Sequence, residues 1–309
     1  MESGLAIPPA FRRRIVDTWG KEGQAWLERL PDLIAHCAER WDLTVESRVP
    51  GLSYGFVAHA STADGTEAVL KLSVPNPELV TEIEALRIFR ERGIVELLEA
   101  DPKLGALLLR RVIPGTLLSD MEDDEEATRI AAPLIRDLPV APPAEHAFPT
   151  LAHWALVFDR LRTQLGPAMG PLPVHVVEKA EGVFRDLQAS SPTGMLLHGD
   201  LHHDNILADR KKGWVVIDPK GVVGDSAFEA ARFQINPWPD LLEMDQPQKV
   251  ARQRLEILAS VLDADPSRLL AWAFFDAVLS ACWSVEEGGE DWWYGIACAE
   301  LFDGIADGW

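Results

Sequence analysis

Residues 196–207 read LLHGDLHHDNIL and carry two aspartates and an asparagine between short apolar runs. Asp200 and Asn205 enclose four residues, and the next apolar run, WVVID, ends at Asp218. The same spacing serves phosphoryl transfer, in which one aspartate receives the acceptor hydroxyl. An asparagine and a second aspartate hold magnesium against the nucleotide phosphates. The stretch therefore predicts Asp200 as a catalytic residue and Asn205 and Asp218 as ligands of Mg²⁺.

The three histidines of this stretch raise a metal cluster as the alternative. His198, His202 and His203 lie near Asp200 and Asp204, and all five side chains belong to types that bind zinc. On an extended loop, however, successive side chains diverge, and no H-x3-H or HExxH spacing brings them to one helix face. The spacing therefore favours phosphoryl transfer over a zinc site.

Phosphoryl transfer of this kind also uses a lysine on a strand and a carboxylate on a helix. Lys71 lies in AVLKLS, the third of three β-rich runs, where its ammonium group can reach the phosphates of ATP. On the helix expected next, Glu82 shares the face of Ile83 and Leu86, whereas Glu84 lies on another face. We predict that Glu82 pairs with Lys71, with Glu84 as the alternative.

Two further segments complete the predicted nucleotide site. The loop PGLSYG, residues 50–55, would bring backbone N–H groups and the Ser53 hydroxyl near the phosphates. The run LLLRRVIPG joins the two parts of the chain, so backbone groups around Arg110, Arg111 and Val112 can hydrogen-bond an adenine edge. This placement follows from the order of the segments along the chain rather than from a motif.

Hydrophobic periodicity predicts an N-terminal lobe at residues 1–112. Helical spacing at residues 11–41 predicts two or three short helices separated by glycine and proline, and residues 42–73 predict three antiparallel strands. Residues 78–93 predict a helix that closes on Gly93, and two further strands complete a small sheet.

The remaining residues, 113–309, predict a larger and mainly helical lobe. Short strands are expected only around the opening stretch and at GWVVIDP, residues 213–219. The fold class predicted for the whole chain is therefore α+β, with a sheet-bearing lobe followed by a helical one.

Composition excludes several classes of function. The 309 residues include 49 acidic and 29 basic ones, and the formal net charge of −20 argues against nucleic-acid partners, which need clustered cations. The three cysteines are widely spaced, with no CxxC pair, which favours a reducing compartment. No export signal and no run near 18 apolar residues is evident, so we expect no membrane partner and a cytoplasmic location.

The quoted motifs resemble those of the aminoglycoside and hydroxyurea antibiotic resistance kinases. LLHGDLHHDNIL is similar to that family's catalytic loop, VIDPKGVVGD to its metal-binding segment, and AVLKLS, EALRIF and IPGTLL to its small-lobe and hinge segments. The resemblance spans most of the chain. It implies a bilobal, protein-kinase-like fold, ATP bound between the lobes, and phosphorylation of a small-molecule hydroxyl, for example on streptomycin.

The same resemblance implies roles for individual residues. Asp200 would be the base, Asn205 and Asp218 the magnesium ligands, and Lys71 the phosphate ligand oriented by Glu82. His198 would organise the loop, and His202 and His203 would flank the acceptor. The chain departs from the expected kinase patterns in two places. Residues 218–221 stand in place of the Asp-Phe-Gly of protein kinases and are not followed by a long activation segment, which argues against a protein substrate. Arg110 stands at a hinge position where the small-molecule kinases often carry glutamate.

A cationic acceptor such as an aminoglycoside needs carboxylates around it. The C-terminal half offers Asp225 and Glu229 in DSAFE, and Glu286 and Glu287 in WSVEEGGEDWWYG, where tryptophans could cover a sugar ring. An exposed acidic loop anchored by core tryptophans explains the second group equally well. The alternatives at the level of function are a kinase of hydroxyurea or another small metabolite, and a nucleotide-binding scaffold without catalysis.

Overall fold

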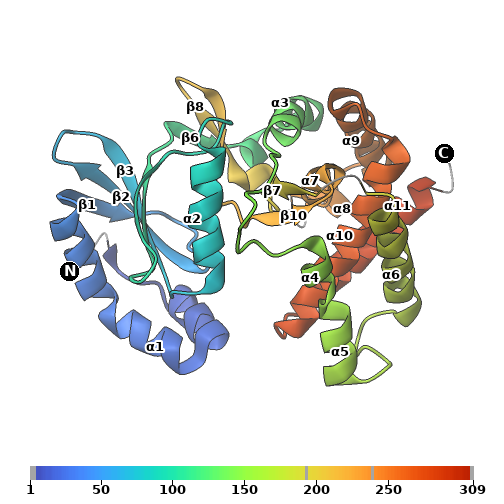
Figure 1. The fold of residues 1–309 in the computed structure, drawn as a ribbon, viewed down its shortest axis with the longest axis horizontal. Helices are drawn as coiled ribbons and strands as arrows, with labels where there is room; N and C mark the ends of the chain where they lie inside the picture. The colour runs from blue at the N-terminus through green and yellow to red at the C-terminus, as the bar shows by residue number, and fades with distance from the viewer. Residues whose placement is uncertain (1–4, 192–193, 238–239, 307–309) are drawn as a thin grey trace. The chain divides into compact units, whose positions relative to one another are not determined.

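The computed structural model describes residues 5–191, 194–237 and 240–306. The chain divides into an N-terminal unit, Met1–Gly115, and a C-terminal unit, Thr116–Trp309. The N-terminal unit holds a five-stranded antiparallel sheet in the order β1-β2-β3-β5-β4 (Figure 1). Its strands are β1 (Leu43–Arg48), β2 (Gly55–Thr62), β3 (Glu67–Ser73), β4 (Leu97–Asp101) and β5 (Ala106–Arg110). The predicted strands of this sheet are therefore confirmed.

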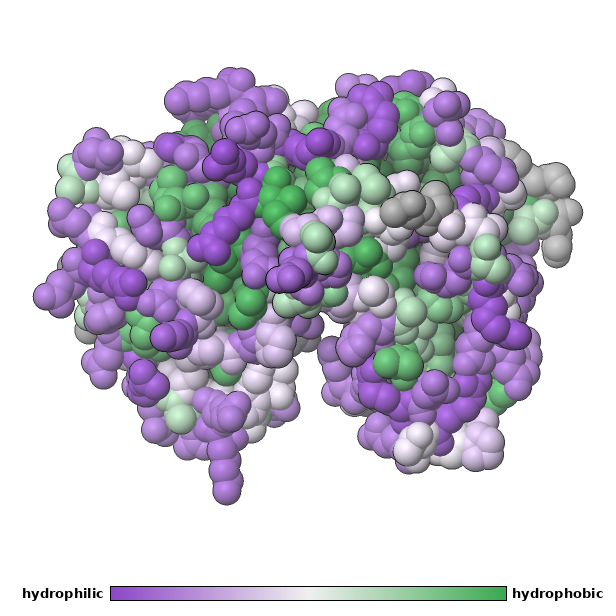
Figure 2. All heavy atoms as spheres, in the orientation of Figure 1, coloured by the Kyte–Doolittle hydropathy of each residue, from purple (hydrophilic) through white to green (hydrophobic). Residues whose placement is uncertain are grey.

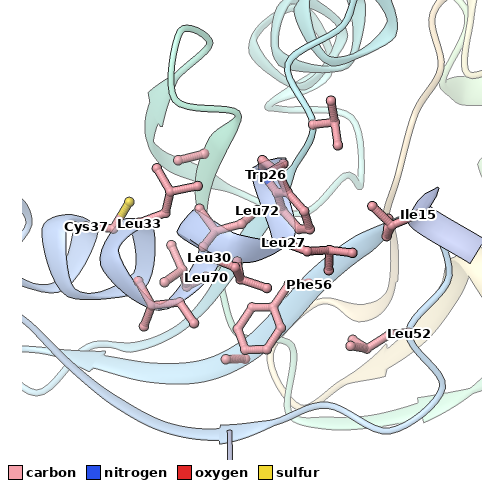
Figure 3. Close-up of a cluster of buried hydrophobic side chains, with 14 of the residues drawn as sticks. Ile15, Trp26, Leu27, Leu30, Leu33, Cys37, Leu52, Phe56, Leu70 and Leu72 are labelled. Carbon is pink, nitrogen blue, oxygen red and sulfur yellow. The ribbon is translucent and has the colours of Figure 1, made fainter. Parts of the chain in front are cut away.

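The two faces of this sheet carry different side chains, because side chains alternate between the faces along each strand. Leu70 and Leu72 of β3 are fully buried against α1 (Pro9–Arg40), in the apolar cluster that Figure 3 shows. Phe56 of β2 joins the same cluster. Lys71, between the two leucines, therefore belongs to the opposite face, and burial on one face fixes the direction of the lysine on the other.

Helix α1 is two helical segments rather than one. Gly20 has φ 54° and ψ −125°, outside helical values, and the helix bends there. The fold-back is close, since a Cβ at Gly23 would collide with the carbonyl oxygen of Ile15. Pro31 lies inside the second segment without ending it. The structure thus realises the lower of the two helix numbers predicted for this region.

Helix α2 (Pro77–Phe89) begins at a strong N-cap. The Asn76 side chain accepts a backbone N–H at 3.0 Å, and proline occupies the first helical position, where its missing N–H costs nothing. The helix ends at Phe89 because a tight turn follows, in which the Arg92 N–H bonds the Phe89 carbonyl at 2.7 Å. Gly93, with φ 81°, lies beyond this turn, so the prediction that the helix closes on Gly93 is wrong.

Two small sheets in the C-terminal unit flank residues 196–207. The loop at residues 198–205 leaves one sheet and enters the other, and Asp218 follows the last strand of the second sheet. One sheet pairs β7 (Met195–Leu197) with β10 (Val222–Gly224), and the other has the order β6-β8-β9, with β6 (Pro114–Leu117), β8 (Ile206–Asp209) and β9 (Gly213–Val216). The hairpin expected between Asn205 and Asp218 is the β8–β9 pair.

Helices make up most of the remaining C-terminal unit. They are α3 (Asp124–Asp137), α4 (Leu151–Ala155), α5 (Val157–Leu165), α6 (Val174–Ala189), α7 (Glu229–Gln234), α8 (Asp240–Glu243), α9 (Pro247–Leu262), α10 (Pro266–Glu286) and α11 (Trp292–Ala306). Short 3₁₀ turns are η2 (Leu118–Asp120), η3 (His203–Asn205) and η4 (Ser226–Phe228). The fold class α+β is confirmed.

Helix α10 is the core of the helical unit. It packs against α5, α6, α7, α9 and α11, and buries Trp272 and Phe275 completely. By length and hydropathy it could cross a membrane, which corrects the expectation that no run approaches a span; 67% of its apolar window is nevertheless buried inside the protein. Polar side chains cover most of the visible surface of each unit in Figure 2, with apolar groups in scattered patches.

Candidate active site

The Lys71–Glu82 ion pair is the centre of the site in the N-terminal unit. Lys71 Nζ lies 2.7 Å from Glu82 Oε1, and the two side chains are 15% and 12% exposed. Pairing across the sheet face follows from the alternation along β3 and from the inward position of Glu82 on α2. Of the two glutamates considered, Glu82 is thus the one that the structure places against Lys71. Partial burial strengthens the attraction relative to a solvent-exposed pair.

The loop before β2 lies close to this lysine. Gly55 opens β2, and a Cβ there would stand 3.3 Å from the Leu72 carbonyl oxygen and 3.8 Å from the Lys71 side chain. Arg14 of α1 donates to the Leu52 carbonyl at 3.0 Å, which ties the loop to the helix. Ser53, next to Leu52, is exposed, as a hydroxyl that meets a nucleotide phosphate must be.

One backbone group of the predicted hinge is already hydrogen-bonded to the sheet. The Arg111 N–H donates to the Glu67 carbonyl at 3.0 Å, and the Arg111 guanidinium pairs with the Glu67 carboxylate at 2.9 Å. This N–H therefore cannot also bond an adenine edge, which corrects part of the prediction for Arg111. The Arg111 carbonyl and the backbone of Val112 stay as the predicted adenine contacts.

In the C-terminal unit, the buried His198 ring holds the loop at residues 198–205 by hydrogen bonds. The ring is fully buried, and Nε2 lies 2.8 Å from the Ile217 carbonyl while Nδ1 accepts the Asp200 N–H at 3.2 Å. The His198 carbonyl accepts N–H bonds from Lys220 and Gly221. Burial lowers the pKa of His198 to about 4, so the ring is neutral and donates through Nε2. These bonds fix the loop beside the segment that contains Asp218.

The Asp200 side chain on this loop lies between two cationic side chains. Its side chain is 24% exposed, with Oδ1 3.5 Å from Arg232 Nε and Oδ2 3.9 Å from Lys220 Nζ. Burial alone would raise the pKa of Asp200, but the nearby positive groups, Lys220 first, outweigh it and hold the pKa well below its usual value. The carboxylate is therefore ionised and able to accept a hydroxyl proton or its hydrogen bond.

Asn205 and Asp218 offer oxygen ligands suited to magnesium. Asn205 Nδ2 donates to the Asp200 carbonyl at 2.8 Å, which leaves the amide oxygen as the atom for a cation. The Ile217 N–H bonds the Asn205 carbonyl at 2.9 Å, so Asp218 follows directly beside Asn205. Asp218 has φ 57°, a left-handed conformation that costs on the order of 1–3 kcal/mol in a residue with a Cβ and is typical of functional sites.

The chemistry of this pair fits magnesium better than zinc. Within residues 5–191, 194–237 and 240–306, no three His, Cys, Asp or Glu side chains are arranged to hold a metal ion. Magnesium, by contrast, commonly takes one or two protein oxygens and completes its shell with phosphates and water. Two oxygen ligands on neighbouring backbone therefore suffice for a magnesium–nucleotide site.

The two histidines predicted near the acceptor have different positions. His202 is partly exposed, with Nε2 3.2 Å from Asn205 Nδ2, and burial lowers its pKa. His203 is buried and stacks on Phe233 with ring centroids 4.0 Å apart. A buried, stacked ring cannot flank a ligand, so the prediction for His203 is wrong, while His202 stays a candidate.

Asp225 and Glu229 are built into the protein rather than presented to a ligand. Asp225 is 3% exposed and accepts hydrogen bonds from Arg268 Nε at 2.8 Å and Trp272 Nε1 at 3.1 Å. Glu229, 1% exposed, accepts the His198 N–H at 2.6 Å and the Gly199 N–H at 3.1 Å. Their carboxylates are used internally, which corrects the acceptor role predicted for both residues.

Glu286 and Glu287 remain near the surface. Glu286 closes α10 and forms a bidentate pair with Arg160 of α5, at 2.5 and 2.8 Å. Glu287 caps the helix and is exposed. Glu287 is exposed and Glu286 is only partly exposed, so Glu287 is the more solvent-accessible of the two predicted carboxylates.

Sequence reasoning missed three charged residues around Asp200. Lys220 and Arg232 flank its carboxylate, and Asp276 of α10, fully buried, lies 3.0 Å from Arg232 Nη2. One signal could have found Asp276, because a lone carboxylate stands inside the apolar run AWAFFDAVLSA and a buried charge needs a partner. Arg232 is one helical turn after Glu229, so both point to the same part of the unit.

The chain is similar to known proteins in sequence and in structure. A family model described as aminoglycoside/hydroxyurea antibiotic resistance kinase matches residues 40–288. The streptomycin 6-kinase of Streptomyces glaucescens is 30% identical over 285 residues, 92% of this chain and 92% of that protein. The hydroxyurea phosphotransferase of Kitasatospora aureofaciens is 33% identical over 273 residues, 87% of this chain and 77% of that protein.

Solved structures agree on the fold. A thermostable mutant of aminoglycoside phosphotransferase APH(4)-Ia superposes with a TM-score of 0.62 at 17% identity, over 88% of this chain and 98% of that one. The fold is thus protein-kinase-like, with an antiparallel sheet in the N-terminal unit and helices in the C-terminal unit.

Proposed function

Because the chain belongs to the aminoglycoside/hydroxyurea antibiotic resistance kinase family, we propose that it transfers the γ-phosphate of ATP to a hydroxyl of an aminoglycoside such as streptomycin. The chain is a small-molecule phosphotransferase related to streptomycin kinases. ATP as donor, Mg²⁺ as cofactor and streptomycin as acceptor are the proposed parts.

The observation that carries the proposal is the fixed loop around Asp200. An ionised carboxylate at the mouth of a loop held by His198 and Glu229 can orient an acceptor hydroxyl and take its proton. In the N-terminal unit, Lys71 is held by Glu82 and presents an ammonium group suited to nucleotide phosphates. Ser53 and the backbone at Val112 are proposed to contact the phosphates and the adenine.

Magnesium would be held by Asn205 Oδ1 and the Asp218 carboxylate. When bound, the ion neutralises charge on the phosphate oxygens and aligns them for displacement. The protein contributes the orientation of its two oxygen ligands, which is set by the Asn205 Nδ2 bond to the Asp200 carbonyl and by the backbone at Asp218.

The proposed acceptor rests on the relatives and on charge. The streptomycin 6-kinases match 92% of this chain, whereas a streptomycin 3''-kinase matches 60%, so the 6-hydroxyl is the first position to test. The net charge of −20 suits a cationic acceptor. His202 and Glu287 are the proposed acceptor contacts. Hydroxyurea is the second candidate, because its phosphotransferase is 33% identical. A cytoplasmic location stays a prediction.

The test is an acceptor screen with the full chain. ATP is supplied with Mg²⁺ or with excess chelator, and ADP release is measured with streptomycin, other aminoglycosides, hydroxyurea or no acceptor. Mass spectrometry of each product then shows whether one phosphoryl group has been added and to which fragment. We expect Mg²⁺-dependent ADP release that requires streptomycin. Acceptor-independent ADP release alone, or none with any compound, would contradict the proposal.

A further inference from the structure

Arg232 joins the catalytic loop to the longest helix of the C-terminal unit. It lies on α7, and its side chain is 11% exposed. Nη1 donates to Ser280 Oγ at 2.6 Å, and Nη2 pairs with Asp276 Oδ1 at 3.0 Å. Nε lies 3.5 Å from Asp200 Oδ1. The guanidinium group thus bridges α10 and the proposed base.

The α10 partners form one face of that helix. Asp276, Ser280 and Trp283 follow at spacings of four and three residues, which places them above one another on α10. The Trp283 ring lies 5.7 Å from the Arg232 guanidinium and 5.8 Å from Lys220 Nζ. Both cations that flank Asp200 therefore lie over one aromatic ring, a favourable arrangement for guanidinium and ammonium groups.

The Arg232 Nε–H is a buried donor close to the carboxylate of Asp200. Among the described residues, this buried nitrogen makes no hydrogen bond, although Asp200 Oδ1 is only 3.5 Å away. Leaving such a donor unpaired costs about 1–3 kcal/mol. A small rotation of the Asp200 carboxylate would satisfy it, and catalytic hydrogen bonds are often long before the substrate binds. The guanidinium therefore favours one orientation of that carboxylate.

We propose that Arg232 is a positioning residue for phosphoryl transfer, which fixes the Asp200 carboxylate while Asp276 and Ser280 fix Arg232. This inference rests on the proposed role of Asp200. It predicts an effect on kcat, because a misplaced base slows the reaction, whereas the nucleotide contacts are unchanged. Arg232 also lines a cavity of about 190 Å³ with Ser280 and Ser284, so a role in acceptor binding instead would raise the acceptor KM.

A double-mutant cycle separates positioning from general structure. The four proteins are wild type, Arg232→Gln, Asp200→Asn and the double variant, and kcat is measured with MgATP and the acceptor found by the screen. We expect Arg232→Gln to lower kcat roughly 10²-fold in the wild-type background and less than about threefold in the Asp200→Asn background. A residue that acts through Asp200 has nothing left to position once that carboxylate is gone.

Two further variants keep the test decisive. Arg162→Gln removes another interhelical guanidinium, which pairs with Glu181 between α5 and α6, and we expect its kcat to stay within about twofold. If Arg232→Gln does not fold, Ser280→Ala removes the Nη1 acceptor at little change in volume, and we expect a three- to tenfold loss that again vanishes with Asp200→Asn.

The outcomes distinguish this inference from the proposed function. Equal fold-losses in both Asp200 backgrounds, an unchanged kcat, or a rise confined to the acceptor KM would each overturn the positioning role while leaving the phosphotransferase intact. An Asp200→Asn variant with full activity would instead overturn the role of Asp200 on which the inference depends.

Discussion

The Lys71–Glu82 pair and the Asp200 loop both hold a charged side chain at the edge of water, but they do so by different means. In the N-terminal unit, a lysine on a strand and a glutamate on a helix are in direct contact at 2.7 Å. In the C-terminal unit, the cations beside Asp200 stand at 3.5 and 3.9 Å, and buried polar groups hold the loop itself.

The difference follows from where the backbone hydrogen bonds go. Along β3 and α2 the backbone hydrogen bonds are satisfied within the sheet and the helix, so Lys71 and Glu82 are not needed to support the backbone. The irregular loop at residues 198–205 has no such ladder. Its N–H groups are satisfied by the Glu229 carboxylate and by His198 Nδ1 instead. The position of the proposed base on this loop therefore depends on the buried side chains of Glu229 and His198.

Removing Asp200 should give the largest effect of all. We expect Asp200→Ala to lower kcat by about 10²- to 10⁴-fold, the usual contribution of a general base, with the KM for MgATP nearly unchanged. Steady-state kinetics with varied ATP and acceptor measures both quantities. Asp204→Ala is the matched control, because Asp204 lies in the same loop with a side chain 52% exposed. Equal losses in the two variants would mean that the loop, rather than the Asp200 carboxylate, carries the effect.

Breaking the Lys71–Glu82 ion pair should give the second-largest loss of activity. A hydrogen bond between charged groups contributes about 1.5–3 kcal/mol, so Glu82→Gln is expected to lower kcat/KM for MgATP by roughly 10- to 100-fold. Titration of ATP at saturating acceptor gives this ratio. Glu84→Gln, on the same helix, should stay within about twofold. If Glu84→Gln is the more damaging variant, Lys71 depends on the other glutamate during turnover.

The sequence predicts the N-terminal half of this comparison well. Alternation around Lys71 and helical spacing around Glu82 are local patterns, and local patterns determine which face of a strand or helix a side chain occupies. The order of strands and helices follows in the same way. The misplaced helix end at Gly93 shows the limit, since the turn at Arg92 stops the helix earlier than the glycine suggests.

The C-terminal half is only partly predictable, for a physical reason. The spacing of Asp200, Asn205 and Asp218 is visible, but a carboxylate such as Glu229 looks the same in sequence whether it meets water or two backbone N–H groups. A cationic acceptor needs carboxylates and acidic residues are usually exposed, so the sequence predicts that Asp225 and Glu229 contact the acceptor. Asp225 instead bonds Trp272 of α10, 47 residues further along the chain, and Glu229 bonds the backbone of residues 198 and 199.

Replacing Glu229, which supports the loop, should lower kcat less than replacing Asp200, the proposed base. Glu229→Gln keeps one acceptor oxygen but turns an amide NH₂ toward a backbone N–H, which leaves a buried donor unpaired. We expect the free energy of unfolding to fall by about 1–3 kcal/mol and kcat to fall with it. Chemical denaturation and kinetics on the same preparation measure both. Glu290→Gln, at an exposed position, should change the unfolding free energy by less than about 0.5 kcal/mol.

Asp276, which belongs to the C-terminal network alone, should make the free energy of unfolding depend on pH. Burial, the largest cause, raises the pKa of Asp276 from 3.8 to about 6, although Arg232 opposes the shift. Between these values the folded state keeps a proton that the unfolded chain has lost, so this contribution to stability is full below pH 4 and lost as the pH rises through 6. The free energy of unfolding of wild type minus that of Asp276→Asn should therefore fall across this range, by at most about 1.4 kcal/mol for each pH unit.

Ser280→Ala is the control for this measurement, because it removes a partner of the same Arg232 that does not titrate, and its difference from wild type should be independent of pH. A difference for Asp276→Asn that rises from pH 4 to 6 would mean that attraction to Arg232 outweighs burial. The Arg232–Asp276 contact would then act as a net attractive ion pair, as we expect of Lys71–Glu82, and the contrast between the two units would lie only in the loop backbone.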